Sequence, residues 1–199
     1  MTIAGTLVAG ARGATALRRA TAEVVLVTAG AALVALGARL SVPLPFSQVP
    51  ITGQTFAVLL VGAALGSGRG VASMLTYLAA AVAGLPIFSG GGCCLPWLLG
   101  PTGGSLMAFP FSAWLVGRLA ERGWDRRFDT AALAMLAGTA VIYAFGVTWL
   151  AAFVGWERAL LAGFLPFLVG DAVKLLLAAA LLPVAWKIIA AVRGVEPGA

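Results

Sequence analysis

Two oppositely charged residues, Asp171 and Lys174, lie inside an apolar stretch that runs from about residue 159 to residue 189. At a spacing of three on a helix, both side chains share one face. A charge at membrane depth costs roughly 2.5–3.5 kcal/mol on insertion scales, and pairing lowers that cost. One interpretation is a structural ion pair that fixes helix packing. We favour a ligand pocket, because ionisable groups within membranes mark functional sites by default.

An Asp and a Lys on one face offer two acceptor oxygens and three donors. They suit a compact polar ligand with its own N–H groups and carbonyl, such as a urea-like ring, and we expect such a ligand to complete their bonding. Pro166 fits the first turn of the surrounding helix, which places Asp171 near the N-terminus, where the helix dipole favours an anion. Further binding residues are expected to be Trp97, Tyr143 and Phe46 as apolar walls, each of which also fits core packing, and Gln48, Thr52 and Gln54 as neutral hydrogen-bonding groups.

The composition is that of an integral membrane protein. Of 199 residues, 61% are hydrophobic and 10% are charged, with a mean hydropathy of +1.04, whereas soluble domains carry about 25% charged residues. The net charge of +6 does not indicate nucleic-acid binding, because the Arg residues are scattered between apolar spans. No His occurs, which excludes His-based metal sites and Ser-His-Asp triads. We predict no bound metal and no cofactor.

The hydropathy pattern predicts an all-α fold with six transmembrane helices over residues 21–193, between a cytoplasmic lead-in (1–20) and a tail (194–199). The predicted spans are Ala22–Leu40, Thr55–Leu65, Val71–Leu85, Ser105–Leu119, Ala131–Val154 and about Ala159–Ile189. The second span is short for a bilayer that needs about 20 residues, unless neighbouring helices shield it. A tight turn is expected at Gly66–Gly70, and a solvated cytoplasmic loop, or a partner-docking loop, at Glu121–Asp129.

Positive charges divide unequally between the two ends of these spans. If the N-terminus is inside, Arg39 and Arg158 fall outside and Lys174 lies within the membrane. Ten residues then fall inside: Arg12, Arg18, Arg19, Arg69, Arg118, Arg122, Arg126, Arg127, Lys187 and Arg193. The positive-inside rule therefore predicts that both termini are cytoplasmic.

Two segments are too rich in proline or glycine to form regular helices, Ser41–Gln54 and Pro86–Gly104. With both termini inside, these segments lie outside, at the same end as the ion pair. Irregular backbone at membrane depth is tolerated where it lines a cavity, so the sequence predicts a pocket open to the exterior. The adjacent Cys93 and Cys94 fit no metal or disulfide pattern and are interpreted as loop or packing residues.

Small residues four apart in the first span, Ala31 and Ala35, allow another helix to approach closely. Packing within the chain and packing against a partner subunit are both open.

An intramembrane enzyme acting on a lipid-linked substrate is the alternative function. The sequence offers no nucleophile–base pair and no paired carboxylates, so we predict that the chain is not an enzyme. A channel is disfavoured because no span repeats a polar face. A scaffold whose Asp–Lys pair is purely structural is the third hypothesis.

Several ordered motifs resemble the BioY family, the biotin-specific substrate-binding subunits of energy-coupling factor (ECF) transporters. The motifs lie between about Ala22 and Ile189 and read PLPFSQVPITGQTFAVLLVGAALG, GLPIFSGGG, GPTGG, LAERGWDR, AVIYAFG and VGDAVK. The resemblance implies a multi-pass protein of the bacterial cytoplasmic membrane that captures biotin from outside.

The resemblance also implies partners, namely a transmembrane scaffold subunit and two ABC ATPases that bind the ATP. The absence of a phosphate loop from this chain fits that division. By resemblance, Asp171 and Lys174 contact the ligand, and Ala31 and Ala35 contact the scaffold. Ser105 follows GPTGG where the family commonly has Tyr, and Cys93-Cys94-Leu95-Pro96 replaces a loop richer in glycine. Ser89 and Gly91 are therefore ligand candidates by position alone. A dedicated or shared energising module, solitary transport and a homo-oligomer all stay open.

Overall fold

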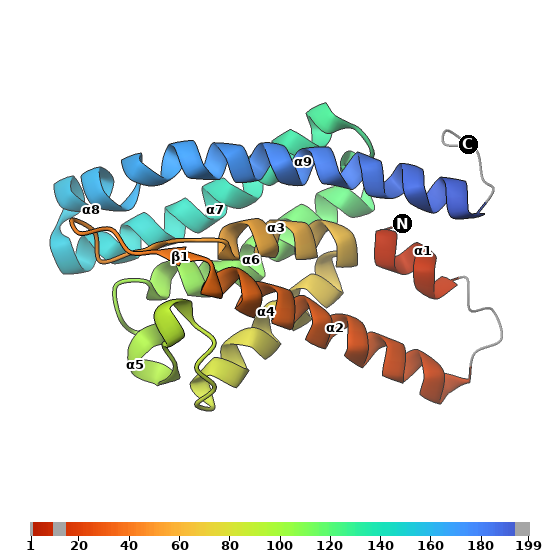
Figure 1. The fold of residues 1–199 in the computed structure, drawn as a ribbon, viewed down its shortest axis with the longest axis horizontal. Coiled ribbons are helices and arrows are strands. Elements are labelled where there is room, and N and C mark those ends of the chain that lie inside the picture. Colours follow the sequence, from red (N-terminus) through yellow and green to blue (C-terminus); the bar gives the residue numbers. More distant parts are fainter. Residues whose placement is uncertain (1, 10–14, 194–199) are drawn as a thin grey trace.

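Residues 2–9 and 15–193 are described by a computed structural model, in which helices make up most of the chain (Figure 1). The longer helices are α2 (Ala16–Arg39), α3 (Gln54–Leu65), α4 (Ser67–Val82), α6 (Gly103–Glu121), α7 (Phe128–Val154) and α9 (Leu165–Arg193). Shorter helices are α1 (Ile3–Ala9), α5 (Cys94–Leu98), α8 (Trp156–Gly163), and the 3-10 turns η1 (Ser89–Gly91) and η2 (Trp124–Arg126). Strands β1 (Ser41–Val42) and β2 (Ile51–Thr52) form an antiparallel hairpin in which Ser41 pairs with Thr52.

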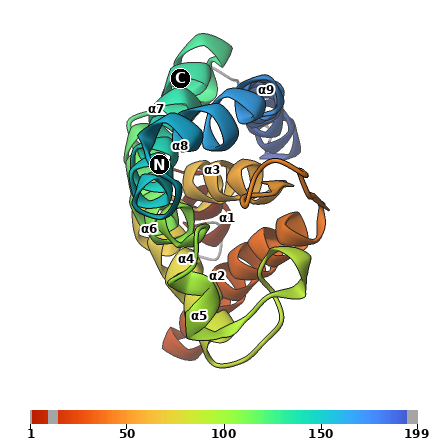
Figure 2. The ribbon, with the colours of Figure 1, turned by 90° about the vertical axis from the view of Figure 1, so that its left-hand side faces the viewer.

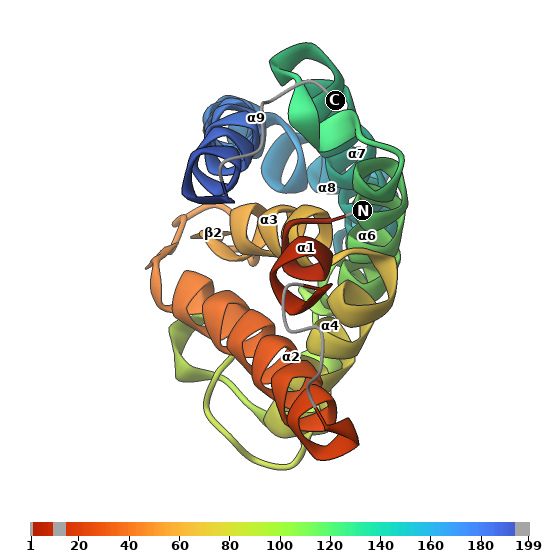
Figure 3. The same cartoon turned by 90° about the vertical axis from the view of Figure 1, so that its right-hand side faces the viewer.

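Three of these helices are long and apolar enough to cross a membrane: Ala16–Arg39, Phe128–Val154 and Leu165–Ala191. The predicted second span, α3, has only 12 residues, so it extends about 18 Å at 1.5 Å per residue. Figures 2 and 3 show α3 in the middle of the molecule, and it contacts α2, α4, α6, α7 and α9. A short helix enclosed in this way is shielded from lipid.

Close backbone contacts at glycine hold α3 and α4 against α6. A Cβ on Gly62 of α3 would lie 2.8 Å from the carbonyl oxygen of Ala113 in α6, and a Cβ on Gly117 of α6 would lie 2.4 Å from the backbone nitrogen of Ser67. Only glycine permits such approaches without displacing backbone. The end of α2 that is remote from the hairpin is attached to α4 by Glu23, which accepts two hydrogen bonds from the Arg69 guanidinium, the first at 2.6 Å.

The predicted turn at Gly66–Gly70 is wrong beyond its first residue. Only Gly66, at φ +88°, separates α3 from α4, and α4 begins at Ser67. Glu121 at the end of α6 accepts hydrogen bonds from the Ser67 backbone N–H (2.8 Å) and hydroxyl (2.7 Å). A carboxylate from a distant helix therefore caps α4 and stabilises a start that the local sequence does not favour.

Other helix boundaries also differ from the predicted ones. The predicted sixth span from about Ala159 is divided, because α8 ends at Gly163 and α9 begins at Leu165. The first long helix starts at Ala16 rather than Ala22, with the Thr15 hydroxyl accepting from the Arg18 N–H, so it extends into the predicted lead-in. Pro166 lies in the first turn of α9, as predicted. The tail over residues 194–199 lies outside the described residues.

The two segments predicted to be irregular contain short elements but no long helix. Ser41–Gln54 holds the hairpin and the first residue of α3, and Pro86–Gly104 holds η1, α5 and the start of α6. Both cysteines are free and half-buried in this second segment. The hairpin, α5 and α8 gather at one end of the molecule, opposite α1 and the C-terminal end of α9 (Figure 1).

The prediction of a solvated loop at Glu121–Asp129 is wrong for Asp125, which is 1% exposed. Its Oδ2 accepts a 2.6 Å hydrogen bond from the Trp186 indole of α9, and the Arg126 guanidinium lies over that indole ring at 5.1 Å. Asp125 Oδ1 has no partner among the described residues. Burial raises the pKa of this carboxyl, against the smaller lowering effect of the Trp186 hydrogen bond.

Asp125→Asn is expected to remove a pH dependence of stability. The folded chain holds the Asp125 proton more tightly than the unfolded chain, so the fold gains stability as the pH falls through the raised pKa toward the ordinary value near 3.9. The Asn variant lacks this gain. At pH 8 its melting temperature should equal or exceed that of the unmodified protein, and the difference between the two melting temperatures should shrink toward pH 5. Melting curves in detergent measure this, with Glu157→Gln, at an exposed carboxyl, as control. Parallel pH profiles for the unmodified protein and Asp125→Asn would contradict the prediction.

Candidate binding site

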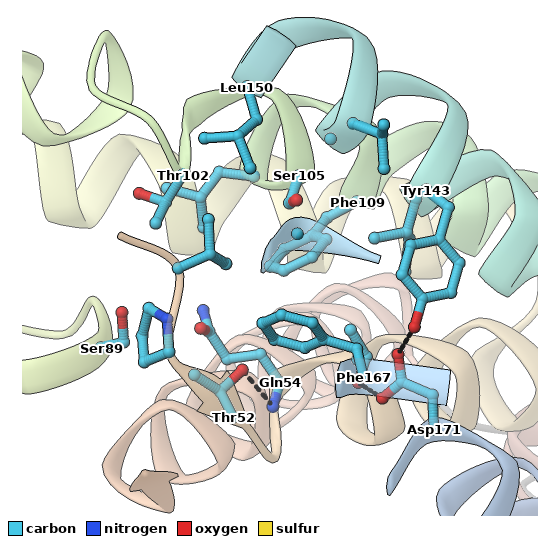
Figure 4. Close-up of a pocket in the computed structure, with 18 of the residues that line it drawn as sticks. Thr52, Gln54, Ser89, Thr102, Ser105, Phe109, Tyr143, Leu150, Phe167 and Asp171 are labelled. Carbon is cyan, nitrogen blue, oxygen red and sulfur yellow. Dashed lines mark hydrogen bonds between the residues drawn. The ribbon is translucent and has the colours of Figure 1, made fainter. Parts of the chain in front are cut away.

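A cavity lies among α3, α6, α7 and α9, beside the hairpin. Its volume is about 70 Å³, whereas small-molecule sites typically enclose about 300–1,000 Å³. Phe109 of α6 and Phe167 of α9 lie in its middle, and Leu150 reaches in from α7 (Figure 4). The polar residues that line it are Thr52, Gln54, Thr55, Ser89, Thr102, Ser105, Tyr143, Asp171 and Lys174.

Lys174 and Asp171 form an ion pair in the wall of this cavity, with Nζ 2.8 Å from Oδ1. Lys174 Nζ also donates to the Thr52 carbonyl oxygen at 2.7 Å and to the Thr55 hydroxyl at 3.3 Å. An ammonium group has three N–H donors. These three acceptors therefore use all of them.

The Asp171 carboxylate is 8% exposed and is bonded from three sides. Its Oδ1 accepts from Lys174 and from the Thr55 hydroxyl (3.3 Å), and its Oδ2 accepts from the Tyr143 hydroxyl (2.5 Å). Figure 4 shows Tyr143 reaching from α7 toward Asp171. The pair lines a cavity, as predicted, but the expectation that a ligand must complete its bonding is wrong, because neighbouring residues already do so.

Local sequence explains how α9 presents this face. Phe167, Asp171 and Lys174 are spaced i, i+4 and i+7, so they lie along one side of the helix. Thr55 is in the first turn of α3, directly after the hairpin, which brings its hydroxyl to the same point.

Six of the predicted binding residues line the cavity: Thr52, Gln54, Ser89, Tyr143, Asp171 and Lys174. Gln54 is 4% exposed, and its Nε2 donates to the Tyr77 hydroxyl at 2.7 Å, so part of its amide is already used in the core. Gln48 and Phe46 line an adjoining hollow instead.

Gly91 and Trp97 are not among the described residues that line the cavity, so their contact with a ligand stays a prediction. Positive φ angles at Gly90 and Gly91 reverse the chain. Trp97 then packs over Gly92, where a Cβ would lie 2.4 Å from the indole ring.

Sequence reasoning missed Thr55, Thr102, Ser105, Phe109 and Phe167. Phe167 had a usable signal, because it lies four residues before Asp171 on the same helical face. The others had none, since their approach to the cavity depends on how α3 and α6 pack.

A second, apolar groove of about 550 Å³ lies on the other side of Tyr143 and Asp171, which line both spaces. The remaining walls come from α7, α8 and α9, with Leu136, Leu160, Phe164, Leu168 and Leu175 among the residues. The Tyr143–Asp171 hydrogen bond therefore lies in the partition between the cavity and this groove.

Ala31 and Ala35 do not have equal access to a partner. Ala31 is 8% exposed and packs in the core with Val34 and Met74, while Ala35 is half-buried against the same cluster. Packing within the chain, the alternative left open by the sequence, is what the structure shows for Ala31. The exposed side of α2 instead carries Thr28, Ala29, Ala32 and Leu36.

Comparison with known proteins identifies the family. The family model for BioY matches residues 7–191. The chain belongs to the BioY family. A probable biotin transporter BioY from Pyrococcus horikoshii is 41% identical over 152 residues, covering 76% of this chain and 88% of the relative. A biotin transporter BioY from Rhizobium etli is 38% identical over 160 residues, covering 76% and 85%.

A solved structure supports the same assignment. The crystal structure of the S-component for biotin from an ECF-type ABC transporter matches with a TM-score of 0.76 and 25% identity, covering 87% of this chain and 95% of that one. BioY proteins are substrate-binding components rather than enzymes, so the alternative of an intramembrane enzyme finds no support. The helical fold described above is a membrane-embedded S-component fold.

The geometry of the BioY site provides a polar corner in an otherwise apolar cavity. The corner combines a carboxylate, an ammonium group and two hydroxyls from α3, α7 and α9. Such groups recognise a ligand by exchanging hydrogen bonds. Within residues 2–9 and 15–193, no three His, Cys, Asp or Glu side chains gather to form a candidate metal site.

Lys174→Met is expected to destabilise the ligand-free protein more than removal of the whole pair. It leaves the Asp171 carboxylate buried without its cation, at a cost of about 3–5 kcal/mol, whereas Asp171→Leu/Lys174→Leu removes both charges. Denaturation in detergent without biotin measures the difference. Lys187→Met is the matched control, because this exposed lysine lies on the same helix. A double variant as unstable as Lys174→Met would contradict the argument.

Proposed function

We propose that this chain is the biotin-capturing subunit of an ECF-type transporter. The observation that carries the proposal is the buried Asp171–Lys174–Tyr143 network in the wall of a cavity, within a chain of the BioY family. Biotin joins a ureido ring, which has two N–H donors and one carbonyl acceptor, to an apolar sulfur-containing ring. In the proposed complex, Asp171 accepts hydrogen bonds from the ureido N–H groups and Lys174 donates one to the ureido carbonyl. Phe109 and Phe167 pack against the apolar ring.

Biotin capture requires the cavity to widen, because about 70 Å³ holds a few water molecules rather than a vitamin. Of the helices around it, α3 and α6 are held by the close contacts at Gly62 and Gly117. The segment between β1 and β2 is the better candidate for movement, because it exposes Phe46 (62% exposed) and ends at Thr52, whose carbonyl accepts from Lys174. We propose that this segment acts as a lid whose attachment loosens when biotin binds.

We propose a topology in which both termini are cytoplasmic and six helices cross the membrane. These helices are α2, α3, α4, α6, α7 and α9. Support comes from the three apolar helices, the enclosed α3 and the ten-against-two division of positive charge. This topology places the hairpin, α5, α8 and the cavity on the exterior side of the bacterial cytoplasmic membrane.

The partners proposed are the scaffold subunit and ABC ATPases of an ECF transporter, with ATP bound by the ATPases. The proposed scaffold-facing surface is the exposed side of α2 at Thr28, Ala32 and Leu36, one residue away from the predicted Ala31 and Ala35. Small residues there permit a close helix approach. A homo-oligomer stays a prediction.

Purified protein is expected to bind biotin, and both Asp171→Asn and Lys174→Ala should weaken binding by about 30-fold or more. Truncating one member of a buried, hydrogen-bonded charge pair costs about 2–5 kcal/mol. Equilibrium titration by calorimetry measures the affinities, and Asp129→Asn, a carboxylate at the far end of the molecule, should bind like the unmodified protein. Unchanged affinity in both pocket variants, with folding confirmed by melting curves, would rule out this site.

Ala32→Trp is expected to reduce co-purification with co-expressed scaffold and ATPase subunits, and biotin uptake, by about tenfold or more. Overpacking a close contact costs about 1–3 kcal/mol, while Ala32 is exposed in the free chain and the fold should persist. Biotin affinity of the isolated chain should stay unchanged. Ala180→Trp, the same change at an exposed position of α9, is the control. Equal losses in both variants would argue against the α2 surface.

A further inference from the structure

Biotin is an anion at neutral pH, because its valerate tail ends in a carboxylate. Lys174, the cation in the described lining of the cavity, is already paired with Asp171. Asp171 already places a negative charge there, which repels a second one. Lys174 bonds to Thr52, Thr55 and Asp171, and the donor that it can release to a ligand is assigned above to the ureido carbonyl. If biotin is the ligand, as proposed above, its carboxylate must lie outside this polar corner.

A hollow of about 400 Å³ adjoins the cavity at the hairpin end. Leu150 lines both spaces. Gln48 lines the hollow and its neighbour Val49 lines the cavity, and the same holds for Ala162 and Gly163. The other walls of the hollow are Phe46, Ser47, Val154, Arg158 and Leu161. One wall therefore comes from the lid segment and the opposite wall from α8.

Arg158 is the charged residue in this wall. Among the described residues it makes no ion pair and no hydrogen bond, and it is exposed. Arg39, the other positive residue predicted to lie outside, is already engaged through a 2.9 Å hydrogen bond to the Pro86 carbonyl. The free guanidinium of Arg158 presents the planar donor fork that binds carboxylates bidentately.

Two neutral donors face the same hollow from the lid segment. The Ser47 Oγ accepts from the Val49 N–H at 3.1 Å, which leaves its hydroxyl hydrogen available to donate, and the Gln48 amide carries two further donors. We propose that Arg158, assisted by Ser47 and Gln48, is the subsite that binds the carboxylate of biotin. The ligand then spans two separate polar groups, with its ureido ring at Asp171–Lys174 and its anionic tail at Arg158.

Arg158→Gln tests this subsite by comparing biotin with biotinamide, in which a neutral amide replaces the carboxylate. The unmodified protein is expected to bind biotin at least about tenfold more tightly than biotinamide, as a charge-assisted bidentate contact allows. In Arg158→Gln this ratio should fall to near one, through weaker biotin binding and unchanged biotinamide binding. Arg158→Lys should retain an intermediate ratio. Raised salt should shrink the ratio of the unmodified protein.

Arg39→Gln is the matched control, because it removes the same charge at the same end of the molecule and should keep the ratio. Equal weakening of both ligands by Arg158→Gln, or an unchanged ratio, would overturn the subsite while leaving biotin capture intact. If the unmodified protein binds neither biotin nor biotinamide, the proposal of biotin capture is overturned, and the proposed subsite with it.

Discussion

The structure depends on a buried ion pair whose hydrogen bonds are all made within the chain. Asp171 and Lys174 lie on α9, but their partners come from α3, α7 and the end of the hairpin. Taking two charges out of water costs several kcal/mol per ion, and only good geometry with further hydrogen bonds offsets this. Tyr143, Thr55 and the Thr52 carbonyl supply those bonds. The pair therefore links three helices to one another even without a ligand.

The rest of the bundle contains helices that pack closely, α3, α4 and α6, and a segment between β1 and β2 that has fewer attachments. Glycine contacts bring the backbones of α3, α4 and α6 so close that these helices cannot separate without loss of packing. The segment between β1 and β2, the proposed lid, is held in contrast by a two-residue hairpin, by the hydrogen bond from Lys174 to Thr52 and by packing of Val49. The cavity is too small for a vitamin and lies beside this segment, which is the geometry expected if the proposed lid opens.

The sequence predicted the features that depend on local spacing and missed those that depend on packing. The shared face of Asp171 and Lys174, the place of Pro166 and the irregular segments all follow from neighbouring residues. The start of α4 at Ser67 depends on Glu121, which lies 54 residues away. The burial of Asp125 depends on Trp186 of α9. The sequence left open whether Ala31 packs within the chain or against a partner, and the packing of α2 decides for the core.

A site that is already satisfied without ligand has consequences for selectivity. A ligand carbonyl that accepts from Lys174 must displace Thr52, Thr55 or Asp171 as acceptor, and a ligand N–H that donates to Asp171 must compete with Thr55 or Tyr143. A ligand with donors and an acceptor in the right arrangement replaces every bond that it breaks. A ligand that lacks one of them leaves a buried charged group short of a partner, at a cost of about 1–3 kcal/mol or more. Discrimination by such a site is strong for missing polar groups and weak for small changes in apolar shape. In the proposed complex with biotin, the ureido ring, rather than the apolar ring beside it, is therefore the part that the cavity distinguishes best.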